Sequence, residues 1–419
     1  MIFSRTVLIV CCISASFFDT SCSGPAEKAG PVPAGADSLH AYAADVAFLK
    51  AHTTGVIELS SRDGQSRILL SAQFQGRVMT STASGLSTPG FGWINYALIG
   101  ARNKKKQFNP VGGEERWWLG PEGGQYGLYF SPGDPFDISH WQVPAFLDTL
   151  PWQVLQADSG GATFACNARF TNYSGTRFSV NAERTVRLLS RNDLQQLLGT
   201  ALPESIKFTG FTSVNRLTNT GDSAWQPRKG LLSQWLLGMF TPGPETYVII
   251  PFHPVPGSAK LINNNYFGPI PADRLRMTDS ALFFSCDGKL RSKIGISPLI
   301  AKPVAGAFDF RKNILTILLP EVSPQAPYVN SKWEKQQEPY HGDVINAYND
   351  GPLPNGDQMG PFFELESSSP AMALDKSAQG VYRQTTCHFQ GDYETLRGLA
   401  KQLLGVDLNA VKLNKKTKS

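Results

Sequence analysis

Strand-length segments of alternating polarity constrain the fold of this chain more than any other feature of its sequence. Within residues 177–188, the apolar Phe178, Val180 and Ala182 alternate with polar side chains. Side chains of a β-strand point to opposite faces in turn, so this pattern predicts a strand with one buried and one solvated face. Ten further segments, bounded by Gly, Pro, Asn or Asp, are predicted as strands on similar grounds. They are residues 54–60, 66–71, 126–130, 162–170, 206–213, 246–252, 282–285, 314–319, 362–366 and 381–389.

Helical periodicity is clear only near the two ends of the chain. The first helix is predicted after Asp37, a candidate N-cap, and the second lies between the candidate N-cap Asp392 and Gly405. Their apolar positions are Leu39, Tyr42, Val46 and Leu49 in the first helix, and Leu396, Leu399 and Leu403 in the second. Because strands and helices do not alternate, a doubly wound or barrel α/β fold is not indicated. We predict an all-β fold of two large, stacked antiparallel sheets with short terminal helices.

Residues 1–22 have the pattern of an export signal. Arg5 supplies the positive charge, and the apolar run 7–18 is shorter than the roughly 20 residues that a membrane-spanning helix needs. A small residue before Cys22 is typical of bacterial lipoprotein signals, whereas Asp19 stands where such signals usually carry an apolar residue. A lipid anchor on Cys22 and plain secretion are therefore both open. Either one predicts an exported protein, periplasmic or anchored to the outer membrane.

The remaining sequence indicates a tether, one domain and a tail. Residues 23–36 are rich in Gly, Pro and Ala, which predicts a flexible tether. Residues 37–411 contain no linker or repeat, so we predict a single domain, followed by the basic tail 412–419. The net charge of +5 is concentrated in that tail and in the lysines of residues 104–106. The body is close to neutral, and a nucleic-acid partner is not expected.

One block, residues 112–124, combines aromatic and charged side chains between two glycine pairs. Glu114, Arg116, Trp118 and Glu122 lie within it. A sugar-binding surface needs flat aromatic faces beside hydrogen-bonding charges, and glycines let the backbone approach a ligand. The alternative is a strand end whose tryptophans pack inward and whose charges are solvated. The sequence leaves both interpretations open.

Two glutamates near the end of the chain share one face of a predicted strand. Glu364 and Glu366 alternate with Phe363 and Leu365, which places the two carboxylates about 6.5–7 Å apart along one face. Their repulsion and partial burial would raise one pKa toward the range that suits proton transfer. Two hydrated glutamates on a solvent-facing strand are the structural alternative.

A histidine and a group of oxygen donors are further candidates. Among the 6 histidines, His140 ranks first because Asp137 precedes it and Trp141 follows it, a composition that suits a ligand rim. A lone histidine is more often structural than catalytic. Asp343, Asn346, Asn349 and Asp350 could offer oxygen ligands to Ca²⁺, but their spacing is not that of an EF-hand, and a turn explains them as well.

Four segments carry a resemblance to a known family. They are residues 112–124, 328–334, 341–352 and 363–371. They resemble an uncharacterised family of exported bacterial lipoproteins, of the type found in Bacteroidetes, that is similar to the galactose mutarotase-like superfamily. This resemblance implies a β-supersandwich with a sugar-binding cleft on its concave face. Members of the superfamily include epimerases, polysaccharide lyases and non-catalytic domains, so the fold does not choose the reaction.

The resemblance also implies a role for Glu366. The dipeptide Leu365–Glu366, followed shortly by Pro370, is similar to the motif that carries the catalytic base of mutarotases. The segment corresponding to their general acid, residues 231–240, contains no histidine. Ring opening needs a proton donor as well as a base, which puts aldose epimerase activity in doubt.

Two functional hypotheses follow. The first is an exported carbohydrate-active enzyme, epimerase-, lyase- or hydrolase-like, in which Glu366, Glu364 and His140 are catalytic. The second is a glycan-binding surface lipoprotein without catalysis. Either would bind a carbohydrate through Glu114, Arg116, Trp118, Glu122, Trp141, Trp235 and Asn346. No cofactor is expected, and Asp343 and Asp350 are weak candidates for Ca²⁺.

Overall fold

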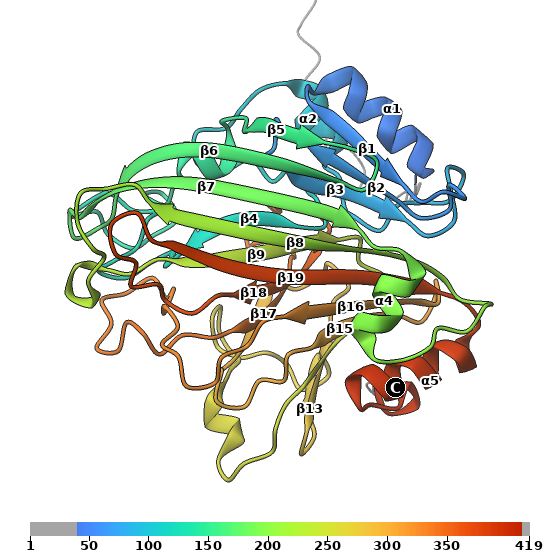
Figure 1. Ribbon diagram of the computed structural model, residues 1–419. Coiled ribbons are helices and arrows are strands. Elements are labelled where there is room, and N and C mark those ends of the chain that lie inside the picture. The colour runs from blue at the N-terminus through green and yellow to red at the C-terminus, as the bar shows by residue number, and fades with distance from the viewer. Residues whose placement is uncertain (1–39, 413–419) are drawn as a thin grey trace, which may run out of the picture. The chain divides into compact units, whose positions relative to one another are not determined.

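Three antiparallel sheets form the framework of residues 40–412, the part of the chain that this computed structural model describes (Figure 1). The smallest contains β1 (Val56–Ser60), β2 (Arg67–Ser71) and β3 (Arg77–Thr82). The largest has, in spatial order, β12 (Leu275–Met277), β13 (Ala281–Ser285), β10 (Thr246–Pro251), β15 (Ala305–Asp309), β16 (Ile314–Pro320), β19 (Gln379–Gln390), β8 (Lys207–Asn219), β7 (Arg177–Leu188), β6 (Gly161–Thr171) and β5 (Gln153–Ala157). The third contains β11 (Ile262–Asn263), β14 (Ser292–Ile296), β17 (Ile345–Asn349), β18 (Phe363–Ser368), β9 (Ser233–Phe240) and β4 (Arg116–Gly120).

Large antiparallel sheets with few short helices confirm the predicted all-β fold. In β7, Phe178, Val180 and Ala182 are buried while the side chains between them are half-buried, as the alternation predicted. The other predicted segments overlap strands, with one exception. Residues 126–130 are a loop, because turns around Gly124 and Gly127 hold the backbone there and no neighbouring strand pairs with it.

The described helices lie at the periphery of the sheets. They are α1 (Tyr42–His52), α2 (Tyr96–Ala101), α3 (Ala145–Asp148), α4 (Arg191–Leu198) and α5 (Tyr393–Leu404), with short 3₁₀ turns at Pro227–Lys229, Ser258–Leu261 and Leu408–Ala410. The α5 prediction is confirmed in detail: Asp392 accepts a hydrogen bond from the backbone N–H of Thr395, and Gly405 ends the helix with a φ of 69°. Helix α1 begins later than predicted, with Ala41 as its N-cap, and Asp37 lies outside the described residues. None of the helices described here combines the length and apolar character of a membrane span.

Helix α4 was not predicted, although its sequence carries a start signal. Ser190 and Asp193 form a capping box, in which each side chain bonds the backbone N–H of the other. The S-x-x-D spacing was therefore visible, but the helix is short and only Leu194 in it is fully buried.

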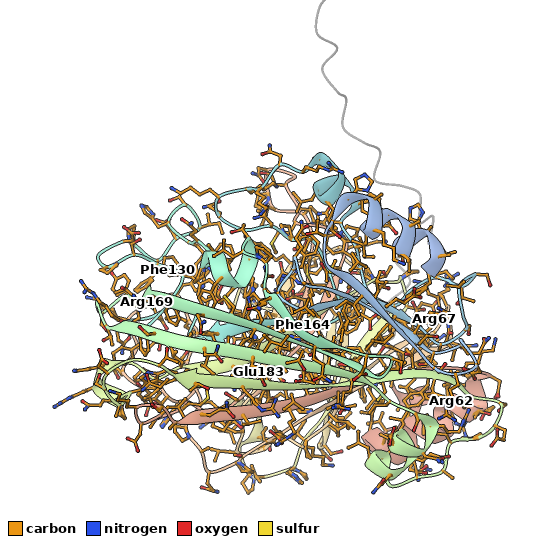
Figure 2. All side chains as sticks on the ribbon, turned by 45° about the horizontal axis from the view of Figure 1, so that its top comes forward. Arg62, Arg67, Phe130, Phe164, Arg169 and Glu183 are labelled. Carbon is orange, nitrogen blue, oxygen red and sulfur yellow. The ribbon has the colours of Figure 1, made fainter. Side chains whose placement is uncertain are left out.

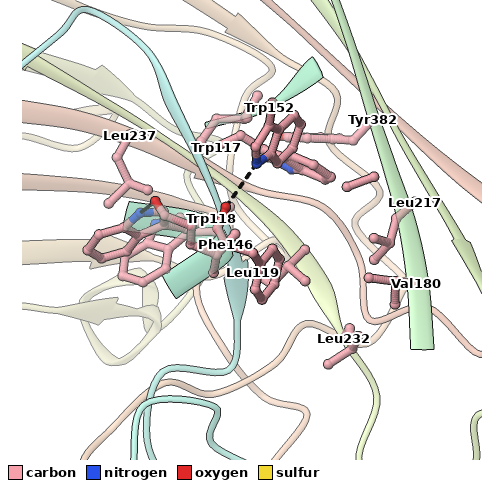
Figure 3. Packing of buried hydrophobic residues seen from close by; sticks show 14 of the residues in the cluster. Trp117, Trp118, Leu119, Phe146, Trp152, Val180, Leu217, Leu232, Leu237 and Tyr382 are labelled. Atoms are coloured by element: carbon pink, nitrogen blue, oxygen red, sulfur yellow. Dashed lines mark hydrogen bonds between the residues drawn. The ribbon is translucent and has the colours of Figure 1, made fainter. Parts of the chain in front are cut away.

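The six-stranded sheet has an apolar face and a polar face. Residues on its apolar face include Trp117, Leu236, Leu365 and Ile294, and they are all buried. They pack with strands of the ten-stranded sheet in two large apolar clusters. Figure 3 shows the first cluster, in which Trp117 meets Trp152 edge to face with ring centroids 5.0 Å apart.

A buried ion pair joins the same two sheets. Arg184 of β7 takes the place of an apolar residue on the inner face, and its Nη2 donates to Oε1 of Glu115 at 2.6 Å. Gln384 of β19 donates to the other oxygen of Glu115, also at 2.6 Å. Burial raises the pKa of Glu115, and Arg184 opposes that shift. The interpretation of the charges near Trp117 as solvated is therefore wrong, because Glu115 and Arg116 are both buried.

We predict that Glu115→Gln destabilises the fold by about 3–5 kcal/mol, because it leaves Arg184 buried without a charged partner. Glu183 is a matched control, since it neighbours Arg184 on β7 but pairs with Arg216 at 3.2 Å on the half-exposed outer face (Figure 2). Glu183→Gln should cost less than about 1 kcal/mol. Urea unfolding of both variants measures the difference, and equal costs would contradict the prediction.

Candidate functional site

The polar face of the six-stranded sheet forms the floor of a cleft of about 1400 Å³. The register places Arg116, Leu237, Glu366 and Asn346 side by side across four strands, and Tyr348 beside Lys293. A strand directs alternate side chains to one face, so the residues that oppose the apolar core necessarily point into this cleft. Loops add the walls, including Glu122, Trp141, Tyr266, Phe267 and Trp333.

A buried ion pair lies on the floor. Arg116 donates from Nη2 to Oε1 of Glu364 at 2.8 Å, and its guanidinium lies 4.1 Å from the ring centroid of Trp118. Both partners line the cleft while being almost fully buried. Burial raises the pKa of Glu364 to about 7, with Arg116 opposing the shift and Glu366 adding to it. Glu364 can therefore hold or release a proton near neutral pH.

Glu366 lies beside this pair but is fully buried. Its Oε2 accepts hydrogen bonds from Lys293 Nζ at 2.8 Å and from Trp235 Nε1 at 3.0 Å. Its Oε1 is buried without a hydrogen-bond partner in the described part of the chain. Burial lowers the pKa of Lys293, but Glu366 and Glu122 outweigh that effect and the pKa is raised. Lys293 thus remains charged and covers Glu366 from the cleft side.

A third carboxyl group, that of Glu122, stands in the cleft wall. Trp141 donates from Nε1 to Oε1 of Glu122 at 2.9 Å, and Trp333 bonds the same carboxyl group. Burial raises the pKa of Glu122, while Lys293 opposes the shift. Two indoles therefore orient this carboxyl group between an aromatic wall and the ammonium of Lys293.

The oxygen donors considered for Ca²⁺ are used by hydrogen bonds instead. Asp343 accepts from the Tyr266 hydroxyl at 2.5 Å, and Asn346 donates to the same hydroxyl at 3.2 Å. Asp350 accepts from Tyr348 and from the backbone of Gly360. Residues 40–412 contain no group of three or more His, Cys, Asp or Glu side chains that could hold a metal ion.

Most of the residues predicted from the sequence meet at this cleft. Those that line it are Arg116, Trp118, Glu122, Trp141, Trp235, Asn346, Asp343 and Glu364. Glu114 does not: it faces the interior, where its Oε2 contacts Ser81 at 2.8 Å and His388 at 3.0 Å. His140 is exposed outside the cleft lining and pairs with Asp137 at 2.7 Å. Neither residue is placed to touch a ligand in the cleft.

Several cleft residues were not predicted. Lys293 and Arg291 alternate with buried residues of β14, so a pair of cations with strand spacing was the available signal. Trp333 and His341 lie in segments that the resemblance covered, but nothing in the sequence places loops against a sheet. His341 is exposed at the cleft and pairs with Glu338 at 3.2 Å.

The sequence model described as a family of unknown function, DUF6786, matches residues 40–415. A search of curated proteins found no match. Among solved structures, the chain is similar to a provisionally assigned aldose 1-epimerase from Escherichia coli K12, with 13% identity and a TM-score of 0.49 over 81% of this chain and 99% of that one. It is also similar to a galactose mutarotase-like protein from Lactobacillus casei ATCC 334, with 11% identity and a TM-score of 0.42 over 80% of this chain and 99% of that one.

A galactose mutarotase-related enzyme from Lactobacillus acidophilus is a third similar structure, with 8% identity and a TM-score of 0.42 over 81% of this chain and 99% of that one. The match to a family of unknown function agrees with the resemblance to an uncharacterised family found in the sequence.

We predict that Glu364 gives the unfolding free energy a specific pH dependence. Its pKa of about 7 in the folded chain lies above the ordinary value of 4.5, so the folded chain holds this proton more tightly than the unfolded chain. The stabilisation is complete below the ordinary pKa and is lost as the pH rises through about 7. The unfolding free energy of the wild type, minus that of Glu364→Gln, should decrease as the pH is raised from about 5 to about 8. A difference that stays constant over this interval would contradict the prediction.

Proposed function

We propose that this chain, which belongs to the family of unknown function DUF6786, binds a carbohydrate in the cleft and moves a proton at a sugar carbon with Glu364. The observation that carries the proposal is the composition of one cleft. It brings together four indoles, those of Trp118, Trp141, Trp235 and Trp333, with buried carboxyl groups and several cations.

The volume and the lining of the cleft suit a saccharide. A cleft of about 1400 Å³ exceeds the range of roughly 300–1,000 Å³ that is usual for small-molecule sites, so it has room for more than one sugar ring. Sugars present apolar ring faces and polar hydroxyl edges. Aromatic side chains match the faces, and the amide of Asn346 and the carboxyl group of Glu122 match the hydroxyls.

Glu364 is better placed than Glu366 to act on a bound sugar. Glu364 lines the cleft, whereas Glu366 is fully buried behind Lys293. A base works best when its pKa is near the working pH, which the value of about 7 provides for Glu364. We therefore assign the base role to Glu364 and a positioning role to Glu366, which holds Lys293. His341 is the proton donor that fits best, because it is the histidine of the cleft lining.

Glu364→Gln should abolish turnover and preserve binding. Loss of a general base lowers kcat by about 10²- to 10⁴-fold. Glutamine is similar in size to glutamate, so the shape of the cleft and ligand binding should be preserved. The measurement is product formation and ligand retention of the wild type and the variant on a panel of polysaccharides and free sugars. Glu334→Gln is the matched control, since Glu334 lines the same cleft but is exposed.

The outcomes separate catalysis from binding alone. A wild-type protein that retains a glycan without forming product would replace the proposal with a non-catalytic glycan-binding protein. Equal turnover of Glu364→Gln and Glu334→Gln would remove Glu364 from the mechanism. Failure of every saccharide to bind would end the carbohydrate proposal.

We also propose that the chain is exported by residues 1–22 and anchored through a lipid on Cys22, both of which lie outside the described residues. The charged start, the short apolar run and the small residue before Cys22 support this proposal. Cys22→Ser should move the protein from the membrane fraction to the soluble periplasmic fraction of a bacterial host. Soluble wild-type protein in the periplasm would indicate secretion without an anchor, and protein retained in the cytoplasm would contradict export.

A further inference from the structure

The acidic and basic side chains of the cleft are partnered unequally. Each buried or half-buried carboxyl group of the floor and wall already has donors: Glu364 from Arg116, Glu366 from Lys293, Glu122 from Trp141 and Asp343 from Tyr266. The cations Lys260, Arg291 and Lys332 also line the cleft, and the described residues place none of them in an ion pair with a carboxylate. Lys260 and Lys332 are exposed, so Arg291 is the cation of the cleft that is half-buried and has no ion-pair partner among the described residues.

Arg291 is the most informative of these cations. It precedes β14 and stacks on Phe267, with the guanidinium carbon 4.1 Å from the ring centroid. In the described part of the chain its guanidinium makes no hydrogen bond, and its Nε is buried without a partner. Asp350, whose pKa Arg291 acts to lower, accepts hydrogen bonds from Tyr348 and Gly360 and not from Arg291. A buried, unpaired guanidinium donor is costly unless a ligand or water satisfies it.

The strand places a second cation beside Arg291. Lys293 lies two residues further along the chain and also lines the cleft. The rise of a strand puts the Cα atoms of two such residues about 6.5–7 Å apart. Its ammonium has three N–H groups, and the described residues provide one acceptor, Glu366. Lys293 therefore contributes positive potential to the same end of the cleft, while Arg291 offers a planar fork suited to two-oxygen contacts.

We propose that Arg291, held on Phe267 and supported by Lys293, binds the oxyanion of an acidic sugar, a uronate carboxylate or a sulfate ester. This inference rests on the proposed function, because it names the substrate class of the same cleft. The anion satisfies the guanidinium that the protein leaves unpaired, and the indoles hold the sugar rings beside it.

Isothermal titration calorimetry with matched ligands tests the proposal. One pair is trigalacturonate and its methyl ester, and the other is a sulfated oligosaccharide and its unsulfated parent, so the two pairs separate uronate from sulfate recognition. The wild type should bind the acidic member of at least one pair tenfold or more tightly. Arg291→Gln should weaken binding of that acidic member by about ten- to hundredfold and leave the neutral member unchanged.

Arg276→Gln is the matched control. Arg276 also stacks on a phenylalanine, with its guanidinium carbon 4.6 Å from the ring centroid of Phe283, and has unpaired buried nitrogens, but it lies outside the cleft lining. The variant changes the net charge by the same amount, so it should keep the full preference for the acidic ligand. Arg291→Lys retains the positive charge but lacks the planar guanidinium, so its preference for the acidic over the neutral ligand should be reduced. This variant keeps the proposal testable if Arg291→Gln does not fold.

The outcomes distinguish the subsite from the proposed function. Equal binding of neutral and acidic members by the wild type, or equal losses in Arg291→Gln and Arg276→Gln, overturns the anion subsite and leaves the carbohydrate proposal standing. Binding of no saccharide of either kind overturns both. Inorganic sulfate that displaces the acidic sugar at equal molar concentration would show an anion site that does not recognise a sugar.

Discussion

The pleat of the six-stranded sheet is the constraint on which the rest of the structure depends. Alternation sends Trp117, Leu236 and Leu365 into the core, and the residues between them into the cleft. A shift of one residue in the pairing of β18 would bury Glu364 and Glu366 against the ten-stranded sheet and expose Phe363 and Leu365. The apolar core therefore fixes which side chains of the sheet can reach a ligand, and the loops supply the walls.

The all-β class was predictable because ten of the nineteen described strands overlap segments predicted from the sequence, although nine strands were missed. Segments with one buried and one solvated face, such as β7, show their period in the sequence. All eight residues of β9 are buried, so this strand does not alternate in polarity, and it was missed. The failure at residues 126–130 has the opposite cause: aromatic residues that look like a strand belong to a loop that packs against the core. Tyr129 shows this, since it is buried while its hydroxyl bonds the backbone of Leu119.

The site was predictable only where residues lie close together in sequence. The shared face of Glu364 and Glu366 follows from period two, but their different environments follow from Lys293, which lies about seventy residues earlier in the chain. Glu114 was misplaced for a related reason: β4 begins at Arg116, and the residues before it turn into the interior toward His388. Partners distant in sequence decide which charged side chains are paired inside the fold, as Glu115 and Arg184 are. They also decide which charged side chains stay available to a ligand, as Arg291 does.

The most direct test of the central claim is an NMR titration of the indole N–H groups with acidic and neutral oligosaccharides. Tryptophans lie both in the cleft lining and in the apolar core, so their indoles report separately on the two. The resonances of Trp118, Trp141, Trp235 and Trp333 should shift with added ligand, while those of the core residues Trp117 and Trp152 should not. Saturable shifts confined to the cleft indoles are the predicted result. Shifts elsewhere in the chain, or none with any saccharide, would contradict the proposal that this cleft binds a sugar.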